Sequence, residues 1–192
     1  DANANSIDGG NGNDTIQGGS GNDTMMGGAG TDTVTYAAAT ATVTVNLATT
    51  AAQNTGGAGT DTISTFENLT GSAFNDTLTG DANANTIKGG AGNDTIQGGA
   101  GNDILDGEAG TDTATYAAAM AAVTVNLATT TAQTTGGAGT DTITNFENLT
   151  GSGYNDTLRG STGNNTLVGG NGNDALYGNS GNDLVYGDAG TD

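Results

Sequence analysis

Thirteen of the eighteen aspartates in the chain occupy one fixed place in a short, glycine-rich unit. The unit reads Gly-Gly-x-Gly-x-Asp-x-apolar-x. Its first complete copy starts at Gly9, and copies follow at 18–26, 27–35, 89–97, 98–106, 107–115 and 169–177. Calcium takes about six to eight oxygen ligands from carboxylates and backbone carbonyls, and glycines let a loop turn its carbonyls inward. The pattern therefore indicates a row of calcium sites. The aspartates at the sixth place are Asp14, Asp23, Asp32, Asp61, Asp76, Asp94, Asp103, Asp112, Asp141, Asp156, Asp174, Asp183 and Asp192.

A plainer interpretation is that these glycine-rich loops are ordinary turns and that the aspartates form a solvated face. Turn chemistry alone explains neither the fixed register nor so much negative charge stacked at close spacing. Magnesium suits the pattern less well than calcium, because it keeps its waters and requires octahedral geometry.

The composition is that of a chain that cannot fold on apolar burial alone. Hydrophobic residues make up 33% of it, glycines number 36, and the net charge is −19 with Lys88 and Arg159 as the only cationic side chains. Low hydrophobicity with high net charge is typical of disorder, whereas a strict repeat indicates order. Both features fit a chain whose folding requires a divalent cation. We therefore expect it to be largely disordered without calcium.

The residue types that are missing exclude several kinds of chemistry. The chain has no cysteine and no histidine, which excludes disulfides, thiolate metal sites and histidine-based catalysis. Its only glutamates are Glu67, Glu108 and Glu147, and the first and last are copies of each other. A glycosidase needs two carboxylates in different environments. We predict that this chain is not an enzyme, while a catalytic domain elsewhere in the same polypeptide stays open.

Charge and hydropathy also bound the partners. There is no basic patch for nucleic acid or another polyanion, and no apolar run approaches the roughly 18–20 residues of a membrane span. The chain begins at Asp1 and stops at Asp192, inside an unfinished nonapeptide, so we expect a fragment of a longer polypeptide. The sequence indicates calcium as its partner and leaves the passenger domain or adhesion target unidentified.

A period of 80 residues contains the shorter one. Residues 1–80 and 81–160 are identical at 62 of 80 positions, and residues 161–192 begin a truncated third copy. We predict three modules with these bounds. The first has nonapeptides at 1–35 and an insertion at 36–70, and the second has nonapeptides at 71–115 and an insertion at 116–150.

The spacing of apolar residues predicts an all-β fold. One apolar residue recurs every nine, as at Ile7, Ile16 and Met25, and no segment has helical periodicity. Such a residue fits a very short strand whose inward side chain stacks on its neighbours. Within the insertions, residues 43–47 and 123–127 alternate as strands do. Residues 48–55 and 128–135 are predicted to be loops, and 56–64 and 136–144 return to the nonapeptide.

The repeats closely resemble the RTX, or haemolysin-type, calcium-binding nonapeptides of secreted bacterial proteins, over about two thirds of the chain. The resemblance implies a right-handed parallel β-roll with two longer strand-loop insertions. Each repeat would form half a turn, and ions would lie between a loop and the next loop on the same edge. It implies that the sixth-place aspartates are side-chain ligands. Loop carbonyls would complete the shell, including those of Gly9, Gly10, Gly12, Gly89, Gly90, Gly92, Gly169, Gly170 and Gly172.

Some loops depart from the pattern. Ala41 and Ala121 remove the sixth-place aspartate, and whether Glu67 and Glu147 bind calcium stays open. Asparagine replaces the aspartate at Asn5, Asn85 and Asn165.

Alternate repeats would fall on opposite edges of the roll, and the two edges would differ. We expect tighter binding on an all-aspartate edge and weak or vacant sites near Ala41 and Ala121, because a site with fewer anionic ligands binds calcium more weakly. In the middle module one edge would carry Asp76, Asp94 and Asp112. The other would carry Glu67, Asn85, Asp103 and Ala121.

The role of the roll stays open at this level. Family members leave the cell by type I secretion, so the resemblance implies a secreted or cell-surface location. It also implies a module that folds on binding calcium and then stiffens its parent protein or acts as a spacer in it. The alternatives are an extender or ligand-binding segment of a large adhesin, and the C-terminal module of a secreted enzyme or toxin. Ice-binding relatives carry a threonine row at the third loop place. Here that place has threonine only at Thr162, so ice binding of that kind is not expected.

Overall fold

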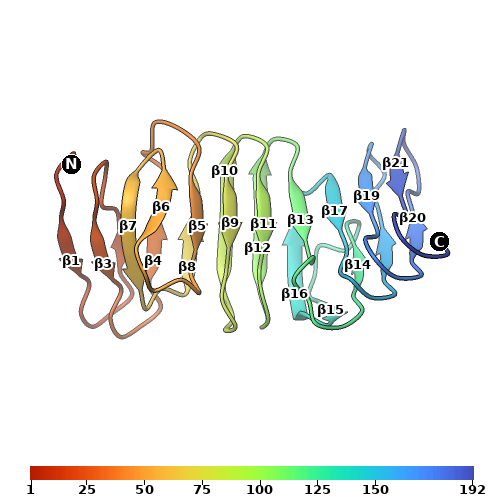
Figure 1. Cartoon of the computed structure of the whole chain (residues 1–192), viewed down its shortest axis with the longest axis horizontal. Coiled ribbons are helices and arrows are strands. Elements are labelled where there is room, and N and C mark those ends of the chain that lie inside the picture. Colours follow the sequence, from red (N-terminus) through yellow and green to blue (C-terminus); the bar gives the residue numbers. More distant parts are fainter.

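The computed structural model describes all 192 residues as one elongated stack of short strands, with the two termini at opposite ends (Figure 1). It contains 21 strands and no helix. Most strands have three residues, and the central one is the apolar residue of the repeat, as in β11, Thr95–Gln97. The predicted all-β fold is therefore confirmed.

The first thirteen strands are β1 (Ser6–Asp8), β2 (Thr15–Ile16), β3 (Thr24–Met26), β4 (Thr33–Thr35), β5 (Thr44–Asn46), β6 (Gln53–Gly56), β7 (Gly59–Ser64), β8 (Asn68–Thr70), β9 (Thr77–Thr79), β10 (Thr86–Ala91), β11 (Thr95–Gln97), β12 (Ile104–Ala109) and β13 (Thr113–Thr115). The remaining strands are β14 (Thr124–Asn126), β15 (Gln133–Gly136), β16 (Gly139–Thr144), β17 (Asn148–Thr150), β18 (Thr157–Arg159), β19 (Thr166–Val168), β20 (Ala175–Tyr177) and β21 (Leu184–Tyr186).

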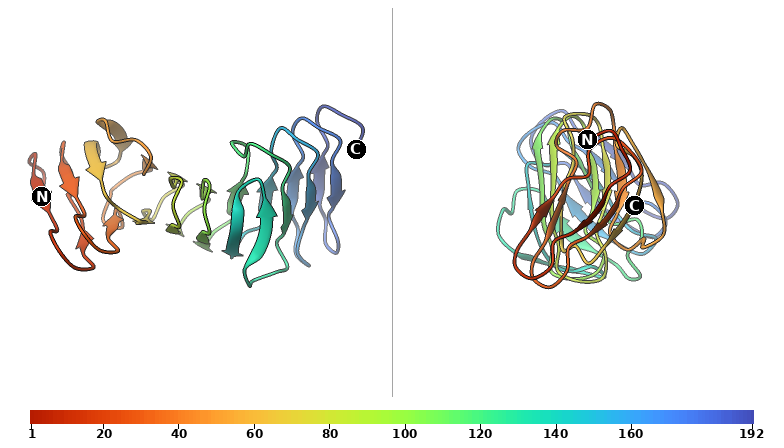
Figure 2. Two further views of the ribbon diagram at one scale, coloured as in Figure 1. Left: turned by 90° about the horizontal axis from the view of Figure 1, so that it is seen from below. Right: turned by 90° about the vertical axis from the view of Figure 1, so that its left-hand side faces the viewer.

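Outside the insertions, successive strands alternate between the two faces of the coil. Figure 2 shows the flattened outline of this coil in the view along the long axis. One face consists of the sheet β1-β3-β7-β6 followed by β5-β9-β11-β13-β17-β19-β21. The other consists of β2-β4-β8-β10-β12-β16-β15 followed by β14-β18-β20. Neighbours within a face are parallel and two repeats apart, as in the pairing of Leu78 with Ile96. This is the parallel β-roll predicted from the repeats.

The insertions interrupt this parallel order with one antiparallel hairpin each. β6 pairs with β7 and β15 pairs with β16 in antiparallel register. The prediction that 48–55 and 128–135 are loops is thus wrong for residues 53–55 and 133–135, which lie in β6 and β15. The polar sequence of these segments does not indicate a strand, and each becomes one by pairing with the strand that follows it, β7 or β16. β6 also lies beside β5, where the Gln53 side chain accepts the Asn46 amide at 2.8 Å.

An 80-residue module contains an odd number of half-turns. Ile7 in β1 and its counterpart Ile87 in β10 therefore lie in sheets on opposite faces, as do β2 and its counterpart β11. Consecutive modules are related by a half rotation about the long axis. The two insertion hairpins accordingly belong to opposite faces, β6 to one and β15 to the other.

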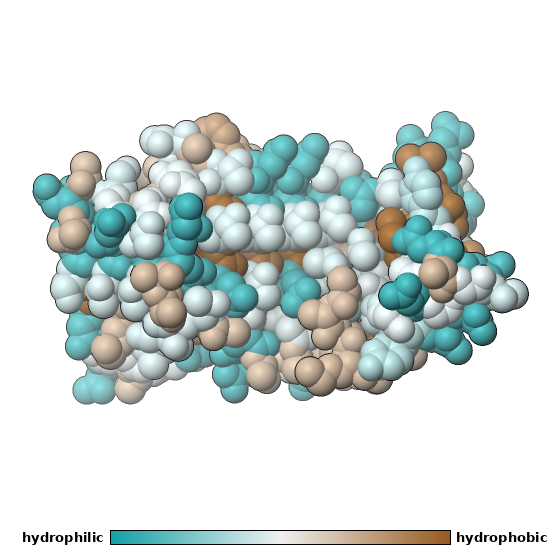
Figure 3. All heavy atoms as spheres, in the orientation of Figure 1, coloured by the Kyte–Doolittle hydropathy of each residue, from teal (hydrophilic) through white to brown (hydrophobic).

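The core is a thin line of apolar side chains between the two faces. It contains 26 buried residues, among them Leu78, Ile87 and Ile96, which are fully enclosed. The surface over it is mostly polar or near neutral, with strongly apolar residues confined to small patches in the view of Figure 3. The structure contains no helix with the length and apolarity that a membrane crossing needs.

Truncating one core residue tests the stacking. Ile96→Ala should lower the free energy of unfolding by about 2–5 kcal/mol, because the coils above and below hold the cavity open. The control is Met120→Ala, since the Met120 side chain is 88% exposed and should cost less than about 0.5 kcal/mol. Denaturant unfolding in excess calcium measures both. Equal losses for the two variants would contradict the stacked core.

Candidate metal centre

The sixth-place carboxylates join neighbouring coils. The Oδ1 atom of Asp94 accepts the backbone amide of Asp76, and that of Asp112 accepts the amide of Asp94. Fourteen such bonds, 2.7–3.0 Å long, recur along the roll, and we call each continuous row a carboxylate ladder. The ladders place loops directly over one another that are 18 residues apart, or 33–38 residues apart where an insertion intervenes.

The second carboxylate oxygen of many of these aspartates is buried without a hydrogen-bond donor. Asp94 and Asp103 are each only 1% exposed, and their Oδ2 atoms have no partner. A buried, unpaired anionic oxygen is costly unless a cation approaches it. The aspartates with such an unpartnered Oδ2 atom are Asp14, Asp23, Asp32, Asp94, Asp103, Asp112 and Asp174.

Neither cation of the chain approaches these oxygens. The Lys88 ammonium pairs with the Glu108 carboxylate at 3.2 Å on the surface. The Arg159 guanidinium lies over the Tyr177 ring, 3.9 Å from its centre. The buried negative charge therefore has no counter-charge within the protein.

The first glycine of each repeat keeps the space beside Oδ2 free. A Cβ atom at Gly89 would collide with the Oδ2 atom of Asp94 and lie 2.7 Å from the carbonyl oxygen of Gly107 on the next coil. The same two kinds of oxygen crowd Gly9 and Gly169. Oδ2 and a main-chain carbonyl thus face a common space that any side chain would fill.

The other two glycines shape the loop. Gly90 and Gly92 have φ angles of 105° and 127°, a region that side chains rarely adopt. The second place holds another residue in a few repeats, as at Glu108 with a φ of 63°. Both places require a left-handed backbone conformation, which glycine adopts in most repeats and which Glu108 adopts at the second place of its repeat.

Four other sixth-place aspartates, Asp61, Asp76, Asp141 and Asp156, have a protein donor on the second oxygen instead. The Oδ2 atom of Asp76 accepts the Ser72 amide at 2.5 Å, and its Oδ1 atom accepts the Ser72 hydroxyl at 2.8 Å. Ser152 and Asp156 repeat this arrangement. Nothing in the nonapeptide pattern signals this role, but both serines stand in the recurring segment Gly-Ser-x-aromatic-Asn-Asp.

The aspartates of the insertion hairpins are closed by hydroxyl groups. The Thr55 hydroxyl donates to the Oδ2 atom of Asp61 at 3.0 Å, and Thr135 does the same for Asp141. The Tyr116 hydroxyl also donates to Asp141, at 3.2 Å. Sequence reasoning missed Thr55 and Thr135, because they lie in strands that were predicted to be loops.

The asparagine loops are closed by their own amide groups. The Nδ2 atom of Asn85 donates to the carbonyl oxygen of Glu67 at 2.9 Å, and its Oδ1 atom accepts the Asp81 amide. Asn165 makes the same bond to Glu147 at 2.7 Å. The amide donor thus meets a carbonyl oxygen of the neighbouring coil directly.

The structure corrects the predicted order of one ladder. Asp141, not Ala121, follows Asp103, since the Asp103 amide donates to Asp141 Oδ1 at 3.0 Å. Ala41 and Ala121 lie against the hairpin glycines Gly57 and Gly137, outside the ladders. Counting nonapeptides along the chain gave the wrong order, because a β-hairpin takes the place of a nonapeptide within each insertion.

The structure also shows that no edge is aspartate throughout. The row Asp76, Asp94 and Asp112 is confirmed, but it continues into Glu147, Asn165 and Asp183. The half rotation between modules moves the aspartate-rich row from one edge to the other. The Glu67 and Glu147 carboxylates act in the ladders as Oδ1 atoms do elsewhere, accepting the Asp32 and Asp112 amides.

Burial controls the ionisation of these groups. It raises the pKa of Asp103 and of Asp112 to about 6, and neighbouring carboxylates add to the effect. Burial likewise raises the pKa of the Tyr116 hydroxyl, with Asp141 as the next cause. It also raises the pKa of Asp61, Asp94, Asp141 and Asp174.

These residues fit a calcium ion. The donor set is entirely oxygen, it combines buried unpartnered carboxylates with main-chain carbonyls, and glycine leaves room for the ion. No three acidic side chains converge on one point, so each ion would draw on carboxylates of neighbouring loops and otherwise on carbonyls. Asp14 with Asp32, and Asp94 with Asp112, are the adjacent pairs with two unpartnered oxygens.

The fold and these loops define a parallel β-roll with acidic, glycine-rich loops along its edges. The sequence matches the family model of the RTX calcium-binding nonapeptide repeat over residues 1–34, 64–87, 79–114, 150–185 and 159–192. These matches cover more than half of the chain, which therefore belongs to the family of RTX calcium-binding repeats. No curated protein matches the chain.

A methyl group at the first glycine tests the cation space. Gly89→Ala should raise the calcium concentration at half-saturation about tenfold or more, because forcing a methyl into close-packed atoms costs about 1–3 kcal/mol. Gly153→Ala is the control, since a Cβ atom there meets nothing within 4 Å. Calcium titration by calorimetry compares them. Matching affinities would show that the space beside Asp94 Oδ2 holds no ion.

The raised pKa values predict a pH dependence. In the folded, calcium-free chain Asp103 and Asp112 have a pKa of about 6, against about 3.9 in an unfolded chain. A raised pKa favours folding below the unfolded value, and that contribution is lost as the pH rises through 6. With chelator, stability should therefore increase as the pH is lowered from 7 to 5. Calcium affinity should fall over the same range, because protons compete for the carboxylates. Thermal melts and calcium titrations at several pH values measure both, and flat profiles would contradict the burial.

Proposed function

We propose that the chain is a calcium-binding β-roll segment of a secreted bacterial protein, which gains structure on meeting calcium outside the cell and then stiffens or spaces its parent polypeptide. The observation that carries the proposal is the set of seven buried Oδ2 atoms without a donor. Membership in the RTX repeat family supports calcium as the ion and export as the context.

We further propose the thirteen sixth-place aspartates as the ligand set, together with the loop carbonyls of glycines such as Gly89, Gly90 and Gly92. The aspartates with an unpartnered Oδ2 atom are the principal ligands. Asp61, Asp76, Asp141 and Asp156 are weaker candidates, because protein donors already occupy their second oxygen. The division into modules at 1–80, 81–160 and 161–192 is part of the same proposal.

A spacer in a large surface adhesin is the second candidate. The near-identity of two 80-residue modules favours it, because repetition lengthens a rod without adding a new kind of site. A module following a secreted enzyme or toxin domain stays possible at the level of the parent polypeptide. The matched family is a calcium-binding repeat, so any catalysis would belong to another domain.

Calcium-dependent folding is the direct test. Circular dichroism in chelator should show much less β structure than the spectrum at calcium concentrations of about 10⁻⁴–10⁻³ M, the range of extracellular calcium modules. Binding free energy is then folding free energy. Magnesium at the same concentration is the matched control and should restore far less, because carbonyl-rich sites suit the larger ion. Identical spectra with chelator, magnesium and calcium would overturn the proposal.

A further inference from the structure

We propose that the chain contains two calcium-independent units, residues 36–88 and 116–168, joined by a stretch, residues 89–115, that is ordered only when calcium is bound. We call the former the insertion units and the latter the repeat linker. The inference rests on the calcium binding proposed above and states which part of the roll the ion controls.

Where a protein donor bonds the second oxygen of a sixth-place aspartate, that donor lies in the same insertion unit as the aspartate. The same is true of the carbonyls that the Asn85 and Asn165 side chains bond. In the first unit, Ser72 closes Asp76, Thr55 closes Asp61, and Asn85 bonds the carbonyl of Glu67. The second unit repeats these contacts with Ser152, Thr135 and Asn165. Neither unit contains any of the seven unpartnered Oδ2 atoms. No buried carboxylate of a unit therefore needs a cation; the one buried side-chain atom left without a partner there is the Tyr36 hydroxyl, which is neutral. The amides of Asp76 and Asn85 are the groups of the first unit that bond linker carboxylates.

The apolar core is concentrated in the same two units. Of the 26 buried core residues, 20 lie within 36–88 and 116–168. The insertions supply bulky side chains that nonapeptides lack, such as Tyr36 and Phe66 in the first unit and Tyr116 and Phe146 in the second. Because buried apolar area drives folding, each unit has a source of stability that does not depend on calcium.

Each unit is also complete as a two-layer structure. In the first unit, β7, β6, β5 and β9 lie side by side on one face, and β8 pairs with β10 on the other. The strands that form these layers are all contributed by residues 36–88, apart from the last three residues of β10. Both layers of the small core are therefore present without the linker.

The repeat linker has the opposite properties. Its only buried core residues are Ile96, Leu105 and Ala114, and it holds three of the unpartnered carboxylates, Asp94, Asp103 and Asp112. It contains five acidic side chains and no cationic one. Without a divalent ion, its buried negative charge opposes the small apolar gain.

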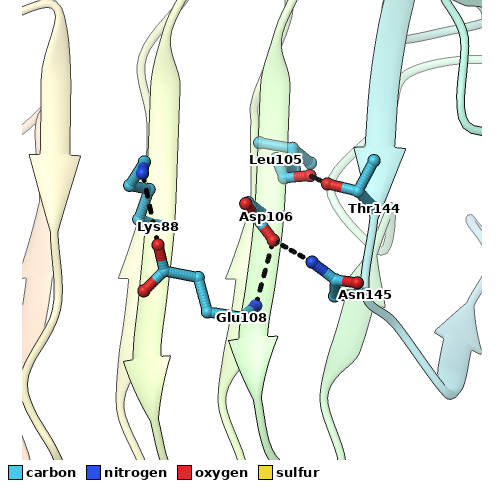
Figure 4. A network of polar contacts seen from close by, with 6 residues as sticks. All are labelled: Lys88, Leu105, Asp106, Glu108, Thr144 and Asn145. Atoms are coloured by element: carbon cyan, nitrogen blue, oxygen red, sulfur yellow. Dashed lines mark hydrogen bonds and ion pairs between the residues drawn. The ribbon is translucent and has the colours of Figure 1, made fainter.

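The linker strands pair with both units, β11 with β9, β12 with β16 and β13 with β17, but the side-chain contacts that support this pairing on the surface are weak. Glu108 pairs with Lys88 of the first unit, and Asp106 accepts the Asn145 amide of the second at 2.7 Å (Figure 4). The Lys88 and Glu108 side chains are 48% and 36% exposed, and exposed pairs of this kind stabilise little. Calcium loading would therefore convert two folded units on a loose tether into one continuous rod.

Each insertion unit and the repeat linker contain one glutamate, so cleavage after glutamate measures how open each of the three regions is. A serine protease that cleaves after glutamate is unaffected by chelator and has one site in each insertion unit, Glu67 and Glu147, and one in the linker, Glu108. In calcium, Glu108 lies in β12 and pairs with β10, so all three sites should resist. In chelator, cleavage after Glu108 should be on the order of tenfold or more faster than at the other two, because proteolysis follows the open population. The expected products are residues 1–108 and 109–192.

A substitution inside a unit tests its closure. Asn85→Asp replaces the amide donor with an oxygen facing the Glu67 carbonyl, so Glu67 should become cleavable in chelator and resistant again in calcium. Asn83→Asp is the matched control, since it makes the same charge change at an exposed place in the same loop, where it removes only a surface bond to Asp81. It should leave Glu67 resistant under both conditions.

The outcomes separate the two proposals. Cleavage that calcium does not change at any site would overturn calcium-dependent folding itself. Equal cleavage at all three glutamates in chelator, with protection in calcium, would leave calcium-dependent folding standing and overturn the insertion units. Resistance of Glu108 in chelator would overturn the calcium-controlled linker.

Discussion

The fold depends on one carboxylate used twice. In a sixth-place aspartate such as Asp94, Oδ1 bonds a backbone amide of the previous coil while Oδ2 stays buried without a donor. The first oxygen sets the spacing of the coils, and the second makes that spacing unfavourable until a cation arrives. Apolar burial cannot offset this charge alone, because each repeat contributes one inward side chain. Stability and ion binding are thus one property in the nonapeptide repeats.

The insertions resolve the same electrostatic problem with protein groups. A serine amide at Asp76, a threonine hydroxyl at Asp61 and an asparagine side chain at Asn85 each replace what an ion would supply. Each is placed by a local turn or hairpin, and each accompanies extra apolar side chains such as Phe66 and Tyr36. The chain therefore alternates two ways of building the same coil, one open to calcium and one closed.

Much of this arrangement follows from the sequence, since the repeats are local. The nine-residue spacing predicted the strand centres and the row Asp76, Asp94 and Asp112, because a regular half-turn leaves no other register. The family resemblance added the roll, and the matches of the RTX repeat family confirm it.

The errors come from the insertions, where register depends on pairing with distant strands. The strand Gln53–Gly56 looks like a loop until β7 pairs with it, and that hairpin brings Asp141 to the place predicted for Ala121. The closures by Ser72 and Thr55 could not be foreseen either, because they depend on which oxygen faces which donor. The expectation of a largely disordered calcium-free chain stays a prediction.

Because consecutive modules are related by a half rotation, the number of modules determines which way the part of the protein after them faces. The gain or loss of one 80-residue module would preserve the register of the repeats on either side of it. It would nevertheless turn everything downstream to face the other way around the axis. A parent protein whose distal part must point in a given direction would tolerate changes of two modules far better than changes of one.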